Sequence, residues 1–251
     1  MKHKYRFRIN DQGNKVLNAS YAYGHDIAIV REEDDGMNPY CFFTSPHLTN
    51  LTDPKEIWAR GISLLSLFRG ATNLFYYNPL NDSDHLLKIE LIELFDWGTN
   101  SNTTPHNTYD ISQNYPFDDS LLDWYDIMVE SNPIAKSIFI SKSNDDILNL
   151  LLQLGNGWNW INLYSILDSL KTYCATQGKD SFVNILNESG HDESDISAFT
   201  GTANNYGLIG VAARHGVKGW TKPKRIVDLK EAQCIIGNLC RSYLKLLYGI
   251  K

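Results

Sequence analysis

The chain has 251 residues, a length that suits one large domain or two small ones. Hydrophobic residues make up 43% of the sequence and aromatic residues 12%, which excludes an intrinsically disordered chain and favours a well-filled core. The formal net charge of −6 argues against general polyanion binding, although a local basic surface is compatible with it.

The same composition predicts a cytoplasmic protein. No apolar run follows the basic amino terminus, so we expect no signal peptide. The sequence also lacks a stretch of about 18 consecutive apolar residues, so we expect no membrane span and no membrane partner. The four cysteines form no Cys-x-x-Cys pair and lie within apolar patterns, as reduced core cysteines do.

The first hundred residues predict a small antiparallel sheet with one helix. Tyr5, Phe7 and Ile9 alternate with basic residues, which indicates a strand with one face in water. Further strands are predicted at residues 16–23, 25–31, 40–44 and 86–95.

The one helix of this part is predicted to run from Asp53 to about residue 71. Asp53 is a suitable N-cap, Pro54 fits the first helical position, and Glu56 completes a capping box. Apolar residues then follow at helical spacing.

Residues 99–116 are rich in Thr, Asn, Ser and Gly and contain Pro105 and Pro116, so they predict a linker or long loop. We therefore expect an α+β domain at residues 1–98 and a helical domain at residues 117–251.

The chain beyond residue 116 has the apolar spacing of helices. They are predicted at residues 117–131, 133–142, 145–154, 158–176, 182–187 and 192–202. A final helix begins at Asp228, where Glu231 forms a second capping box. The predicted fold class is α+β, with a small antiparallel sheet and one helix followed by an all-α bundle.

Arg214, His215 and Gly216 stand shortly before this final helix. Arg-His-Gly is also the signature of histidine phosphatases, in which the His accepts the phosphoryl group and the Arg clamps phosphate. That chemistry needs the triplet after an early strand and a second His far downstream. No histidine follows Gly216 in this sequence, so the phosphatase interpretation is set aside.

Residues 199–216, the basic loop after them and the capped final helix resemble the carboxy-terminal part of HEPN-type helical domains. These include the abortive-infection C-terminal domains of bacterial defence proteins. The resemblance covers roughly residues 117–250 and depends on the helix order and on residues 213–216.

This resemblance implies metal-independent RNA cleavage, without a cofactor, at a site formed across a homodimer. His215 would be the general acid and base, Arg214 or Arg225 would stabilise the phosphorane, and Asn204 would orient the phosphate.

The spacing of these residues departs from the HEPN pattern, in which an Arg precedes the His by five to seven positions. Here those positions hold Leu208, Ile209 and Gly210, and Arg214 is adjacent to His215 instead. Asn204 supplies a polar partner only if the chain turns back near Gly207 or Gly210. The alternative hypothesis is a non-enzymatic interaction or scaffold protein in which Arg214 and His215 are structural.

A basic loop follows, and it predicts binding of RNA or a nucleotide. Its candidate binding residues are Lys218, Trp220, Lys222, Lys224 and Arg225. Cations beside an aromatic ring can hold phosphates and unstacked bases, although such a run is also typical of a solvated loop. We predict no metal site, because the acidic segment 191–195 is better explained as a helix start. A protein partner is the other expectation.

Overall fold

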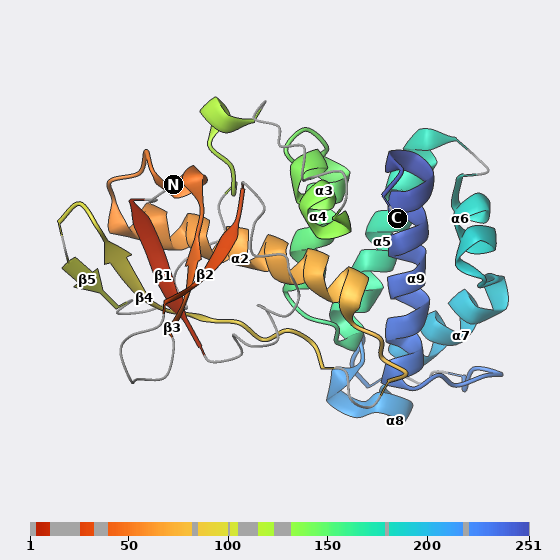
Figure 1. The fold of residues 1–251 in the computed structure, drawn as a ribbon. Coiled ribbons are helices and arrows are strands. Elements are labelled where there is room, and N and C mark those ends of the chain that lie inside the picture. Colours follow the sequence, from red (N-terminus) through yellow and green to blue (C-terminus); the bar gives the residue numbers. More distant parts are fainter. Residues whose placement is uncertain are drawn as a thin grey trace. The chain divides into compact units, whose positions relative to one another are not determined.

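The computed structural model describes residues 4–10, 26–32, 40–81, 85–99, 101–104, 115–122, 132–178, 181–217 and 221–250. The chain forms two compact units (Figure 1). Unit 1 comprises Met1–Ala71 and Leu87–Leu148, and unit 2 comprises Thr72–Leu86 and Asn149–Lys251. The fold class is α+β with a helical bundle in the carboxy-terminal half, which confirms the predicted class.

Unit 1 contains an antiparallel sheet in the order β2-β3-β1-β4-β5 (Figure 1). Its strands are β1 (Tyr5–Ile9), β2 (Ala28–Glu32), β3 (Tyr40–Thr44), β4 (Leu91–Asp96) and β5 (Ser101–Thr103). The strand predicted at residues 16–23 lies outside the described residues.

One row of side chains crosses the sheet and is buried. Ile29 pairs with Phe43, Phe43 with Phe7, and Phe7 with Leu94, and none of the four is more than 3% exposed. Trp58 of helix α2 (Pro54–Tyr76) meets the Phe7 ring edge-on at 4.8 Å between ring centroids. The apolar residues of the predicted alternation in the first strand therefore lie on one face of the sheet. Helix α2 covers that face.

Helix α2 begins where the sequence predicts and ends later. Asp53 Oδ1 accepts a hydrogen bond from the Lys55 amide at 2.9 Å, as an N-cap does. The helix continues past residue 71 to Tyr76, because Leu74 is still fully buried and packing supports another turn.

Two segments differ from the sequence prediction. Residues 101–103, inside the predicted linker, form the edge strand β5. The described start of the helix predicted at 117–131 is a 3-10 turn at Asp119–Leu121, and residues 123–131 lie outside the described residues. The Asp118 carboxylate accepts from the Ser120 amide, a local bond that competes with a helix.

The boundary between the two compact units falls within a helix, after residue 148. Helix α3 (Pro133–Ser141) and the first residues of α4 (Asp145–Gly155) belong to unit 1 with the sheet. The division into domains at 1–98, 99–116 and 117–251 stays a prediction.

Unit 2 is built mainly from helices. They are α5 (Trp160–Gln177), α6 (Ser181–Ser189), α7 (Glu193–Ala203), α8 (Tyr206–Ile209) and α9 (Leu229–Tyr248). Helix α9 contacts α5, α6 and α7, and its Tyr243 is fully buried. As predicted, Asp228 caps α9, with its carboxylate accepting from the Glu231 amide at 2.8 Å.

Within the part of the chain that the structure describes, no helix is long and apolar enough to cross a membrane.

We predict that Gly61→Val lowers the free energy of unfolding by about 2–3 kcal/mol, because overpacking forces a well-filled core apart. A Cβ on Gly61 would lie 2.5 Å from Cε2 of Phe7. Gly216→Val is the matched control, since a Cβ there meets no described atom within 4 Å. Denaturant unfolding measures both variants, and equal losses would show that the Phe7 contact does not limit residue size at position 61.

Candidate functional site

The chain turns back between α7 and the Arg-His-Gly step. Gly210 adopts a positive φ of 59°, a conformation that favours glycine, and a 3-10 turn follows at Gly210–Ala212. The Arg214 amide then donates to the Ala203 carbonyl at 2.9 Å. This is the reversal that the sequence required before Asn204 and Arg214 could meet.

The side chains of Asn204 and Arg214 both contact Tyr164 of α5. The Arg214 guanidinium lies over the Tyr164 ring, 4.2 Å from its centroid. The Asn204 amide nitrogen lies 3.5 Å from the Tyr164 hydroxyl, a long contact. Tyr164 is not among the site residues that the sequence predicts, because its place in a helical apolar pattern gives no signal of a site.

Two polar groups at this place are incompletely satisfied. Arg214 makes an ion pair of 3.7 Å with Asp168, but both side chains are about half exposed, so the pair is weak. Oδ1 of Asn204 is buried without a hydrogen-bond partner in the described structure. A buried unpaired polar atom is uncommon and calls for a physical explanation, such as a bound ligand.

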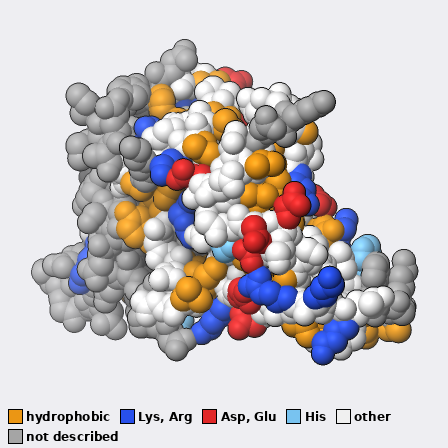
Figure 2. Space-filling view, turned by 90° about the vertical axis from the view of Figure 1, so that its right-hand side faces the viewer, with side chains coloured by type: hydrophobic (Ala, Val, Ile, Leu, Met, Phe, Trp, Pro, Cys, Tyr) orange, Lys and Arg blue, Asp and Glu red, His pale blue; other side chains and the backbone are white. Residues whose placement is uncertain are grey.

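The segments on either side of Arg214 expose both apolar and basic side chains. Val211 and Val217 are 88% and 81% exposed, and Lys222 and Lys224 are exposed as well. His215 is half-buried. Lys218 and Trp220, both predicted to bind a ligand, lie outside the described residues. Figure 2, viewed from the side of α6 and α7, shows basic and acidic side chains intermingled in the lower part of the surface.

Arg225, the last predicted binding residue, is already paired. Its guanidinium forms ion pairs with Asp195 and Glu231. The hydrogen bond that the Arg225 guanidinium donates to the Asp195 carboxylate is the main reason that the pKa of Arg225 is raised. The charge of Arg225 is therefore largely neutralised within the chain, in contrast to that of Arg214.

A chain of side-chain hydrogen bonds continues from Asp195 into α9. His191 Nδ1 lies 2.9 Å from Asp195 Oδ2, and His191 Nε2 lies 3.1 Å from the amide nitrogen of Asn238. Arg241 donates to Asn238 Oδ1 at 2.7 Å, so the Asn238 amide nitrogen is left to donate to His191. The sequence predicted 191–195 as a helix start, and the capping box between Asp192 and Asp195 confirms it.

Opposing effects act on the pKa of Asp195. Burial raises it, but hydrogen bonds from Arg225 and His191 favour the charged form, and the pKa is lowered from 3.8. The ionised carboxylate therefore stabilises the folded state at pH values above the pKa that Asp195 has in the unfolded chain. That contribution is lost as pH falls through the lower folded-state pKa.

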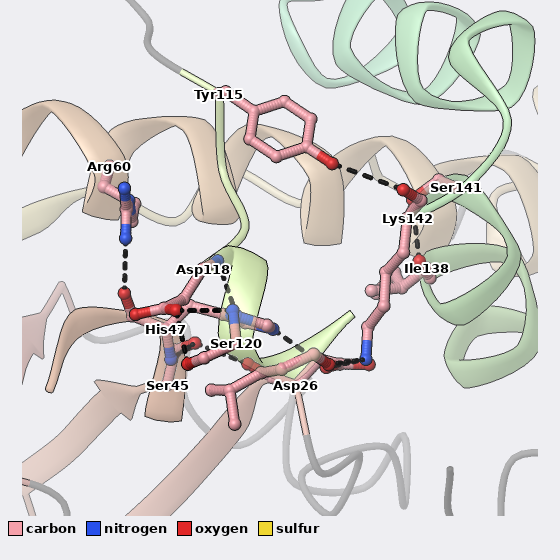
Figure 3. Close-up of polar contacts among 11 residues, drawn as sticks. Asp26, Ser45, His47, Arg60, Tyr115, Asp118, Ser120, Ile138, Ser141 and Lys142 are labelled. Carbon is pink, nitrogen blue, oxygen red and sulfur yellow. Dashed lines mark hydrogen bonds and ion pairs between the residues drawn. The ribbon is translucent and has the colours of Figure 1, made fainter. Parts of the chain in front are cut away.

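A second polar cluster, in unit 1, was not foreseen from the sequence (Figure 3). Asp26 precedes β2, His47 lies in the 3-10 turn Pro46–Leu48, and Lys142 caps the end of α3. Oδ1 of Asp26 lies 2.8 Å from His47 Nε2 and 2.5 Å from Lys142 Nζ. All three residues are at least nine-tenths buried.

Further hydrogen bonds fix each member of this cluster. The Asp118 amide donates to His47 Nδ1 at 3.0 Å, so Nε2 carries the proton that faces Asp26. Lys142 Nζ also contacts the Leu121 carbonyl at 3.3 Å, and Ser45 Oγ donates to the Asp26 carbonyl at 2.6 Å. With both imidazole nitrogens engaged, the arrangement suits a structural tie better than proton transfer to a substrate.

Among the residues that the structure describes, no group of three or more His, Cys, Asp and Glu side chains lies close enough to hold a metal ion.

No protein-family model matches this chain, and no curated protein or solved structure matches it either. The HEPN resemblance and the roles it implies for Asn204, Arg214 and His215 therefore stay predictions.

We predict that Asp26→Ala lowers the free energy of unfolding by about 3–5 kcal/mol, because it leaves buried Lys142 and His47 without their carboxylate. The double variant Asp26→Ala with Lys142→Met should lose less than the sum of the two single losses, since it removes the orphaned ammonium.

The control for the loss caused by Asp26→Ala is Glu188→Gln, which breaks the more exposed ion pair between Glu188 and Lys245. It should cost less than about 1 kcal/mol. If Asp26→Ala cost no more than Glu188→Gln in denaturant unfolding, the buried cluster would not be the tie described.

We also predict that Arg225→Gln raises the pKa of Asp195 toward 3.8, because one of the hydrogen bonds that favour its carboxylate is removed. Carbon NMR of the Asp195 carboxyl group during an acid titration measures the change. Lys224→Gln removes an exposed neighbouring charge and should leave the titration unchanged. An unchanged pKa in Arg225→Gln would mean that the ion pair does not persist in solution.

Proposed function

We propose that this chain is an intracellular RNA-binding protein of the bacterial defence type, with a HEPN-like helical domain. Its RNA site would be the surface formed by Tyr164, Asn204, Arg214 and His215, which we call the Arg214 surface. The observation that carries the proposal is the half-exposed Arg214 guanidinium over the Tyr164 ring, beside the buried Oδ1 of Asn204, which has no hydrogen-bond partner in the described structure.

The chemistry of the Arg214 surface fits single-stranded RNA. A guanidinium that lies over a tyrosine ring can stack on an unstacked base, while its N–H groups donate to a phosphate. Exposed Val217 adds an apolar contact, and Lys222 and Lys224 add positive charge in the following loop. With a chain charge of −6, we expect few phosphate contacts and moderate affinity.

If the Arg214 surface is catalytic, we propose metal-independent cleavage of the bound RNA. His215 would move the proton as general acid and base, Arg214 would stabilise the phosphorane, and Asn204 would orient the phosphate. Arg214 suits this role better than Arg225, because Arg225 is already paired with two carboxylates. A homodimer would complete the site, as the HEPN resemblance implies.

The alternative is a non-enzymatic interaction or scaffold protein. Two contacts support it, since the Arg214 amide holds the Ala203 carbonyl and its guanidinium already pairs with Asp168. In that case the exposed Val211 and Val217 would contact a protein partner.

We predict that Arg214→Gln weakens binding of a fluorescent single-stranded RNA by about 10-fold, because a charge-assisted hydrogen bond to phosphate is lost. The slope of log affinity against log salt should fall by about one unit. Lys55→Gln is the charge-matched control, because it removes an exposed cation at the start of α2. Equal affinity of wild type and Arg214→Gln would contradict the proposed site.

Cleavage is tested separately by incubating total RNA with stoichiometric protein in the presence of a chelator. Fragments with wild type and intact RNA with His215→Ala would support the ribonuclease. If both leave the RNA intact while wild type still binds it, the site binds RNA without cutting it.

A further inference from the structure

We infer that a pocket beside the carboxy-terminal half of α9 binds a small anion that carries an apolar group. The pocket has a volume of about 420 Å³. Its walls include Phe75, Asn238, Arg241, Ser242, Lys245 and Ile250, all of which belong to unit 2. None of them forms part of the Arg214 surface, so this inference does not depend on the proposed function.

Arg241 is the cation that this pocket presents. Among the described residues its guanidinium donates to the Leu74 carbonyl at 2.5 Å and to Asn238 Oδ1 at 2.7 Å, and it makes no ion pair with a carboxylate. The acid in the pocket wall, Glu188, pairs with Lys245 instead. Burial lowers the pKa of Arg241, as expected for a cation removed from water.

Capping explains one part of this arrangement but not the whole. The Leu74 carbonyl lies in the last turn of α2, where carbonyls lack partners within the helix, so one N–H of Arg241 caps that end. A guanidinium has five N–H donors, and a cation at a helix end needs no cavity beside it. The donors left over are available to an anion in the pocket.

Ser242 gives a second and independent indication. It is 6% exposed, yet within the described structure its hydroxyl makes no hydrogen bond. A serine inside a helix commonly bonds the carbonyl one turn back, as Ser165 does with Ile161. The Ser242 hydroxyl in the pocket wall is therefore a donor without a partner, next to a cation without a counter-ion.

The apolar wall sets the kind of ligand. Phe75 and Ile250 face the same pocket as Arg241 and Ser242, so part of the ligand should be apolar or aromatic. The volume lies within the range of about 300–1,000 Å³ that is usual for small-molecule sites. The geometry points to a phosphate or a carboxylate joined to a small ring, with Arg241, Ser242 and Lys245 donating to its oxygens.

Isothermal titration calorimetry of the full chain with three probes tests the inference. The probes are adenosine 5′-monophosphate, benzoate and inorganic phosphate. We expect one of the two ring-bearing anions to bind at least about 10-fold more tightly than inorganic phosphate, because it also fills the apolar part of the pocket. The tighter of the two decides whether the ligand's charged group is a phosphate or a carboxylate.

Two variants locate the binding. Ser242→Ala removes a hydroxyl without a partner and favours the helix, so it should fold normally and bind about 10-fold more weakly. Arg241→Lys keeps a charge but loses the planar fork, and it should weaken binding by a similar factor. Ser165→Ala and Lys55→Gln are the matched controls outside the pocket and should bind like wild type.

The inference fails if neither ring-bearing anion binds at millimolar concentration, or if Ser242→Ala and Arg241→Lys bind as wild type does. Thermal unfolding without ligand shows whether each variant is folded. RNA binding by Ser242→Ala should be unchanged, so loss of this site and loss of the Arg214 surface are distinguishable.

Discussion

A charged or polar group taken out of water needs a partner, and this requirement organises both units. In unit 1 a single carboxylate oxygen of Asp26 is the partner of both His47 and Lys142. The residues joined in this way come from the start of β2, the turn after β3 and the end of α3. Unit 1 therefore uses its buried charge to tie distant segments, and the cluster leaves little for a ligand to satisfy.

Three arginines of unit 2 differ in how far acidic groups of the chain compensate their charge. Arg225 is paired with two carboxylates and is consistent with a structural role. Arg214 lies on Tyr164 with a weak, exposed ion pair, and Arg241 donates only to neutral oxygens among the described residues. Arg214 and Arg241 lie at the two places where we propose ligands. An anion bound at either place would supply the counter-charge and the hydrogen-bond acceptors that the chain itself does not provide.

Features that depend on near neighbours in the sequence were predictable. The alternation in β1, the caps at Asp53 and Asp228 and the helical spacing around Trp160 each involve residues within one or two turns or pleats. The helix expected at 117–131 shows the limit of such patterns. A local hydrogen bond from Ser120 to Asp118 stabilises a 3-10 turn at its start, and apolar spacing does not report that competition.

The sequence by itself determined the α+β class, most helices and the position of Arg214 and Asn204 before the last helix. Tertiary structure decided what these residues meet, because the turn at Gly210 and the position of α5 bring both to Tyr164. It also decided that Arg225 is neutralised by Asp195, and that Asp26, His47 and Lys142 share one buried site. The physical reason is that charge compensation is a property of positions in space, whereas local patterns constrain only residues a few positions apart.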